Sequence, residues 1–217
     1  MTAIDATGLP AGPDAAPVEP AALTGPLAGD PAALGLPSFV VGSVALGLVL
    51  VGMVPASAAG ASLPVILAAT SVGLFVATVW SAAIGQSAVA GIFGIFAGFW
   101  LSYAVLVLGL THNWFGIGAD AAKSTQELFL TAWLILIVLL TLATLRLPLG
   151  FTALFVLIDL ALLLVLIGTA QASTGVLKFA GVVVLAFAAL GAYMFLGTVS
   201  AALGGRTMSL GNPIMRG

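Results

Sequence analysis

GQSAVAGIFGIFAGFWL, residues 85–101, contains no charged side chain, and the apolar run that it opens continues to Val107. A run of this length is sufficient for one helix to cross a membrane. The rest of the chain has the same character, since 62% of its 217 residues are hydrophobic, only 6% are charged and the mean hydropathy is +1.29. A soluble domain carries about 25% charged residues. The sequence therefore predicts an all-α integral membrane protein.

The helix predicted from residues 85–101 has two different faces. Gly91, Gly94 and Gly98 fall within roughly 60° of one another at 100° per residue, and the Gly94–Gly98 spacing allows close helix packing in lipid. The opposite side carries four rings, those of Phe93, Phe96, Trp100 and Tyr103. We expect the glycines to pack against another helix and the rings to shape a cavity. Ordinary packing in the bilayer is the alternative for both sets.

The composition argues against several classes of function. The chain has no cysteine and one histidine, His112, so we expect no metal site and no cofactor. No span contains His, Cys or a pair of carboxylates, which argues against an enzyme. The scattered charges form no basic patch, so we expect no nucleic-acid partner and take the lipid bilayer as the surrounding medium.

Hydropathy predicts three regions along the chain. Residues 1–38, rich in Pro and Ala, are expected to be a flexible cytoplasmic tail, residues 39–205 a domain of six transmembrane helices around a pore, and residues 206–217 a short cytoplasmic tail. Ser124 and Glu127 have the spacing of a capping box, which predicts that the fourth span begins near Glu127. The predicted spans are residues 39–54, 63–84, 85–110, 127–146, 148–169 and 178–205.

The basic residues near the span ends predict the orientation. Six spans place both termini on one side, together with Arg146, Arg206 and Arg216, whereas Lys123 and Lys178 lie on the other side. Cytoplasmic loops carry the excess of basic residues, so we expect both termini to lie in the cytoplasm. We expect the membrane to be the plasma membrane or, in a bacterium, the inner membrane.

Four short motifs within residues 30–211 occur together in a distinctive order and spacing. The first is residues 30–36, with Asp30, Pro31, Leu34, Gly35 and Leu36. The others are the third predicted helix with Gly85, Phe93, Phe96 and Phe99-Trp100-Leu101, the last helix with Phe179-Ala-Gly181, Tyr193 and Gly197, and its end at Gly205-Arg-Thr207. In this order and spacing they resemble the acetate uptake transporter family of the SatP/YaaH type, and residues 30–36 look like that family's signature at the head of its first helix.

The resemblance implies a six-helix protomer in a hexameric ring, with a pore through each protomer. It places a hydrophobic constriction at Phe39, Phe96 and Ile158, and implies proton-coupled uptake of acetate, succinate and similar carboxylates. The sequence departs from the family pattern at Asp30 and Ala33, where the signature has Asn and Pro. Position 96 is Phe here and usually Tyr in the family.

Asp159 is the one carboxylate deep inside a predicted span. A charge at that depth costs at least about 2.5 kcal/mol on insertion scales, so the side chain needs a cavity, a partner or a proton. We therefore single out Asp159 as a candidate proton carrier, with Thr152 on the same helix face. The alternative is a structural hydrogen bond to a Ser, Thr or Tyr of a neighbouring helix.

These observations favour a membrane transporter or channel for small carboxylates, acetate and possibly succinate among them. Two alternatives stay open at this stage. One is a channel for small neutral solutes, because a narrow apolar ring admits neutral solutes more readily than hydrated ions. The other is a membrane scaffold that transports nothing, in which the glycines serve packing alone.

Overall fold

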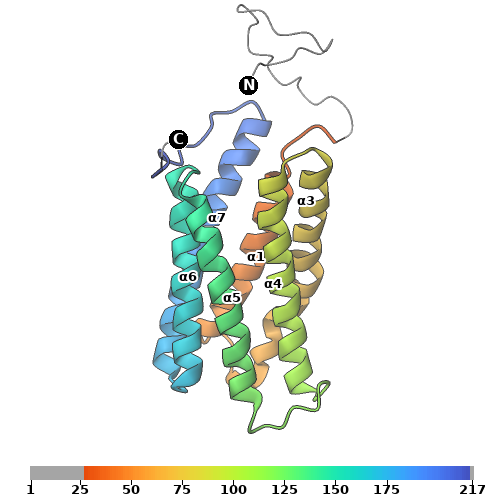
Figure 1. Cartoon of the computed structure of the whole chain (residues 1–217), viewed down its shortest axis with the longest axis vertical. Helices are drawn as coiled ribbons and strands as arrows, with labels where there is room; N and C mark the ends of the chain where they lie inside the picture. Colours follow the sequence, from red (N-terminus) through yellow and green to blue (C-terminus); the bar gives the residue numbers. More distant parts are fainter. Residues whose placement is uncertain (1–26, 216–217) are drawn as a thin grey trace, which may run out of the picture.

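The computed structural model describes residues 27–215, and every regular element in that range is helical. Six helical stretches are long and apolar enough to cross a membrane (Figure 1). The all-α architecture with six candidate spans is therefore confirmed. The elements are α1 (Ala32–Val51), η1 (Ala56–Ser62), α2 (Leu63–Val65), η2 (Ile66–Ser71), α3 (Val72–Ala83), α4 (Ser87–Thr111), α5 (Ala122–Thr144), α6 (Leu149–Ala170) and α7 (Thr174–Ala202).

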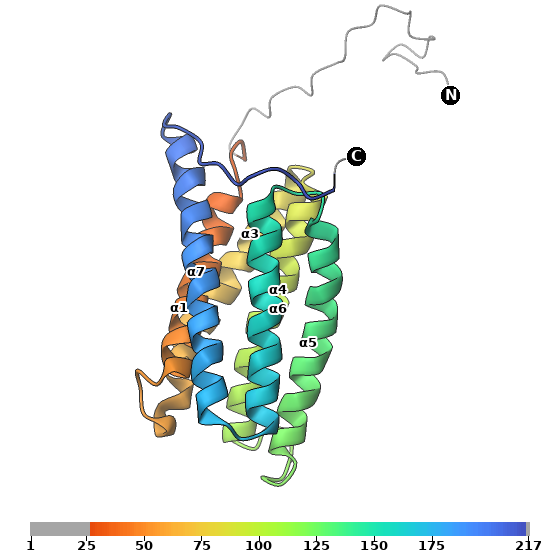
Figure 2. The same cartoon turned by 90° about the vertical axis from the view of Figure 1, so that its left-hand side faces the viewer.

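The long helices stand side by side in an up-and-down bundle (Figures 1 and 2). The start of α1 and the end of α7 lie at one end, together with the α3–α4 and α5–α6 turns; we call this the terminus end. The α4–α5 loop, the α6–α7 turn and the segment after α1 lie at the opposite end, the loop end. Arg146 and Arg206 therefore share the terminus end, as the sequence predicts.

The first helix begins earlier than hydropathy predicts, at Ala32 instead of residue 39. The Asp30 carboxylate accepts a hydrogen bond from the Ala32 N–H at 2.9 Å, which satisfies one of the free donors at the helix start. Pro37 lies inside the helix and removes only one backbone donor. Pro31 and Pro37 thus belong to the head of α1 and not to a tail. Residues 1–26 of the predicted tail, and Arg216, lie outside the described residues.

The second span runs from Gly60 to Ala83 and changes pitch along its length. Residues 56–62 are 3₁₀ with a kink at Ala58, Pro64 occupies the first turn of α2, and residues 66–71 form a π-helical segment. The Ser71 hydroxyl donates to the Ile66 carbonyl at 2.8 Å, five residues back, which the wider π pitch brings within its reach. This wider turn places Thr70 against α1.

Small residues let α1 approach its neighbours closely. A Cβ at Gly42 would overlap the Thr70 side chain, and a Cβ at Gly73 would overlap Ser38. On α7, a Cβ at Gly181 would lie 2.8 Å from the backbone N of Val51. Close approach of backbones is the main source of helix association in lipid, since apolar side chains gain little by leaving lipid for protein. These contacts hold α1 between α3 and α7.

The capping box predicted at Ser124 and Glu127 is wrong. Helix α5 begins at Ala122, one turn before Glu127, and the Ser124 hydroxyl donates to the Ala121 carbonyl at 3.0 Å. Lys123 holds this helix start by donating to the Ala170 carbonyl at the end of α6. No described side chain caps the start of α5, and its first turn instead contacts the end of α6 through Lys123.

Replacing Gly181 with Ala tests the close approach of α1 and α7. The new methyl meets backbone atoms of α1 that cannot rotate away, so we expect a loss of about 1–3 kcal/mol in stability. The measurement is the thermal unfolding midpoint in detergent. Gly175→Ala on the same helix is the control, because the nearest atom to its Cβ is Ser173 Oγ at 4.0 Å. Equal midpoints for the two variants would contradict this packing.

Candidate functional pore

The residues predicted to form a constriction do meet at one place near the middle of the bundle. Phe39, Phe96 and Ile158 all line a small central cavity of about 40 Å³. They come from α1, α4 and α6, and each is about 5% exposed. The Phe39 and Phe96 rings lie 5.1 Å apart, edge to face. We call these three residues and the rings around them the constriction.

Two further rings complete the constriction. The Phe187 ring of α7 lies 5.6 Å from that of Phe39, and the Phe155 ring of α6 lies 5.6 Å from that of Phe96. The sequence analysis did not single out either residue. For Phe155 a signal was present, because Phe151, Phe155 and Ile158 recur at helical spacing on one face of α6.

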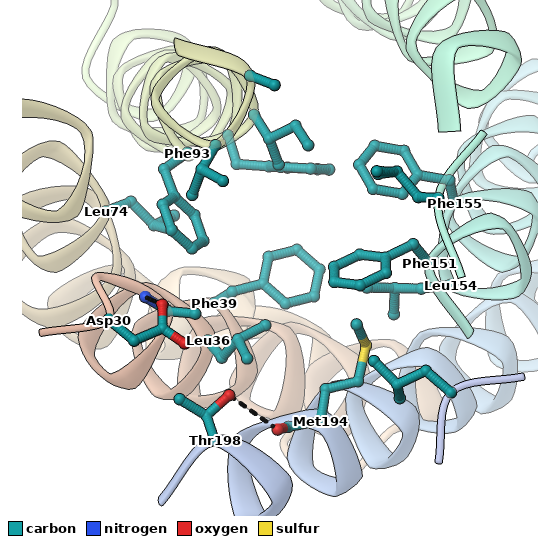
Figure 3. A pocket seen from close by; sticks show the side chains of 17 residues that line it. Asp30, Leu36, Phe39, Leu74, Phe93, Phe151, Leu154, Phe155, Met194 and Thr198 are labelled. Atoms are coloured by element: carbon teal, nitrogen blue, oxygen red, sulfur yellow. Dashed lines mark hydrogen bonds between the residues drawn. The ribbon is translucent and has the colours of Figure 1, made fainter. Parts of the chain in front are cut away.

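A larger cavity of about 340 Å³ opens from the constriction toward the terminus end. Its walls are mainly apolar and include the rings of Phe39, Phe93, Phe151 and Phe155, which Figure 3 shows converging on the space between the helices. Its polar lining residues are Asp30 and Thr198, whose hydroxyl donates to the Met194 carbonyl at 3.2 Å. We call this space the terminus-side cavity.

A third cavity of about 390 Å³ opens toward the loop end and is called the loop-side cavity. It is lined by five helices, α1, α4, α5, α6 and α7, and includes four residues with polar side chains. These residues are Tyr103, Thr111, Gln126 and Thr169.

The three cavities follow one another along the bundle. Phe39 and Phe96 line both the terminus-side cavity and the central cavity. Leu46 and Val165 line both the central cavity and the loop-side cavity. Together the three cavities have the shape of an hourglass, because two wide cavities are joined through the narrow apolar constriction. Such a narrowing expels water readily and opposes the passage of hydrated ions.

The signature residues at the head of the first helix build one wall of the terminus-side cavity. Asp30 caps α1, as described above, and Pro31 is buried behind it. Gly35 lies so close to α4 that a Cβ would overlap the Phe93 ring, and Leu36 lines the cavity. Leu34 is half-buried and packs against the core.

The glycines of α4 do not share one partner. A Cβ at Gly94 would lie 3.2 Å from Thr78 of α3, whereas one at Gly98 would lie 3.7 Å from Trp133 of α5. Gly91 is exposed, and a Cβ there would have no described atom within 4 Å. That Gly91 packs against a helix stays a prediction. The partner helix would have to come from outside residues 27–215 of this protomer, for example from a second copy of the chain. The four rings opposite the glycines do line the cavities.

Asp159 lies away from this path, on the side of α6 that meets α5. The Thr141 hydroxyl donates to its Oδ2 at 2.7 Å, and Asp159 lines none of the three cavities. Thr152 continues the polar seam toward the terminus end by donating to the Thr144 carbonyl at 2.9 Å. This is the hydrogen bond to a neighbouring helix that the sequence left open as the alternative. The proton-carrier role stays a prediction.

The fold defines a six-helix membrane protein with three adjoining cavities between its helices. A sequence profile of the GPR1/FUN34/yaaH family matches residues 15–204, and the chain belongs to this family. A search of curated protein sequences finds no match.

The fold is shared with a solved membrane protein. A structure described as that of the bacterial acetate channel SatP superposes with a TM-score of 0.73 at 21% sequence identity. The match covers 84% of this chain and 98% of that one. The six-helix arrangement described above is therefore that of a known channel.

Replacing Asp159 with Asn tests the two roles open to this residue. Asn keeps the size and can still bond to Thr141, but it cannot carry a proton. Because Asp159 lies off the path, we expect unchanged stability and an unchanged dependence of uptake on external pH in proteoliposomes. Asp159→Leu is the companion variant, and loss of its bond to Thr141 should lower the unfolding midpoint. A flattened pH profile in well-folded Asp159→Asn protein would instead establish the proton-carrier role.

Proposed function

We propose that this protein is a membrane channel or transporter for small carboxylates, with acetate and succinate as the first substrates to test. The observation that carries the proposal is the alignment of two wide cavities on either side of the apolar constriction. The family membership and the shared fold with a bacterial acetate channel support it.

The constriction also supports a role for protons in uptake. Its lining, from Phe39 and Phe96 to Ile158, offers no charge to an anion that has lost its water. Leaving water costs a charged carboxylate far more than its neutral acid. We propose that the solute crosses as the acid, or together with a proton, so that uptake follows the pH gradient.

The proposal also includes the membrane, the orientation and the oligomeric state of the protein. We infer that it lies in the plasma or inner membrane with both termini in the cytoplasm, which places Arg146 and Arg206 there. We also infer a homo-oligomer, a hexamer by family resemblance. The open space at Gly91 on α4 supports such an assembly, because a neighbouring backbone could approach it closely.

Uptake of labelled acetate into proteoliposomes tests the function. Phe96→Ala removes a ring from the constriction, so we expect faster acetate uptake and measurable uptake of a longer carboxylate such as butyrate. Phe75→Ala is the matched control, because Phe75 is 61% exposed on the outer side of α3. It should behave like the wild type.

The same assay separates the alternatives. A protonophore should slow acetate uptake if protons are coupled, whereas uptake of a neutral solute such as urea that a protonophore does not change would favour the channel for neutral solutes. No uptake of any solute by well-folded wild-type protein would favour the scaffold. Wild-type behaviour of Phe96→Ala with all solutes would place the constriction elsewhere.

A further inference from the structure

The two wide cavities differ in the hydrogen-bonding groups that they present. The loop-side cavity is lined by a phenol, an amide and two hydroxyls, those of Tyr103, Gln126, Thr111 and Thr169. The Thr111 hydroxyl donates to the Val107 carbonyl at 2.7 Å and is engaged by its own helix. Tyr103 and Gln126 come from α4 and α5, so two different helices contribute polar side chains to the cavity lining.

The Tyr103 ring is held in place by neighbouring aromatic rings. It stacks on Phe99 with centroids 6.5 Å apart and meets Trp100 edge to face at 6.3 Å. The Phe129 ring of α5 also lies 6.5 Å from the Tyr103 ring. A donor on a ring fixed in this way loses little freedom when it binds a ligand. Its hydroxyl is thus a preorganised donor beside the constriction.

Trp100 contributes a second donor next to the loop-side cavity, in the central cavity that adjoins it through Leu46 and Val165. It is 1% exposed and lines the central cavity, and its indole N–H has no partner within residues 27–215. A buried donor without an acceptor is costly. A solute that carries acceptor oxygens would relieve that cost on reaching the constriction.

Two charged side chains, Lys123 and Glu127, lie near the rim of the loop-side cavity. The Lys123 ammonium donates to the Ala170 carbonyl, next to Thr169 in the cavity wall and one turn from Gln126. Glu127 lies 3.8 Å from the same ammonium and offsets part of its charge. The uncharged donors of Tyr103 and Gln126 are therefore the main argument, and Lys123 adds a local attraction at the rim.

The terminus-side cavity offers much less to an anion. Its polar lining residues are Asp30, whose carboxylate repels a negative charge, and Thr198, whose hydroxyl is bonded to Met194. The contrast between the two cavities, and not the polarity of one alone, indicates where a carboxylate would reside.

We propose that the loop-side cavity is a carboxylate-binding site, with the Tyr103 hydroxyl, the Gln126 amide and the Trp100 indole N–H as donors to the carboxylate oxygens. The site holds the solute at the loop end of the constriction before it crosses. This inference rests on the proposed function for its role in transport, but binding at the site is measurable without transport.

Two single substitutions and one matched control test the site. Tyr103→Phe and Gln126→Leu each remove a donor to a charged group, so we expect the half-saturation concentration of acetate uptake to rise at least about tenfold. The control is Tyr193→Phe, which removes the other phenol of the chain; its hydroxyl donates to the Ser209 carbonyl outside the cavities, and it should keep the wild-type value. Thr198→Val in the terminus-side cavity is a comparison variant, and its half-saturation concentration should rise less than that of either test variant.

A binding measurement accompanies the uptake assay. Acetate that binds the folded protein raises its unfolding midpoint, and this shift should be lost in Tyr103→Phe and kept in Tyr193→Phe. Elution on gel filtration shows that each variant is folded, and Trp100→Phe should also weaken the shift.

The outcomes distinguish the site from the function. An acetate-dependent shift without uptake in the wild type would reject the proposed function and support the site. Uptake with wild-type half-saturation in both Tyr103→Phe and Gln126→Leu would overturn the site and leave the function standing. A rise in half-saturation that is confined to Thr198→Val would place binding in the other cavity and overturn the inference as well.

Discussion

The close approach of α1 to α3 and α7 is the constraint on which the rest of the structure depends. In lipid the helices gain little from hiding apolar side chains, so association relies on backbones that come near one another. Gly42, Gly73 and Gly181 provide that approach around α1. Because α1 is held there, Phe39 meets the rings of α4 and α7 in the middle of the bundle. Packing of small residues thus positions the large ones.

The effect of the constriction on a solute depends on the cavities that lie on either side of it. An apolar narrowing alone resists every hydrated solute. Wide cavities on both sides bring the solute to it, and donors near Tyr103 and Gln126 offset part of the lost hydration on one side. Asp159, by contrast, is bonded to Thr141 away from the path. The polar groups that matter for passage are therefore expected to be uncharged donors.

The sequence predicted the six helices well because a membrane span is a property of local composition. The constriction residues were predicted through family resemblance, since Phe39, Phe96 and Ile158 lie on three helices and share no local pattern. The start of α1 and the start of α5 were misplaced, because Asp30 and Lys123 act through contacts that hydropathy does not register. Gln126 was missed for a similar reason: its role depends on the convergence of five helices.

The most direct test of a single path through the constriction uses the absence of native cysteine. Cysteine is introduced singly at Leu110 in the loop-side cavity and at Thr198 in the terminus-side cavity. Acetate uptake is then measured after treatment with a thiol reagent that cannot cross the membrane, added to one side or to the other. We predict that each cysteine blocks uptake when modified, and that each reacts from its own side only. Full uptake after modification of both variants, or reaction of both from the same side, would contradict the hourglass path.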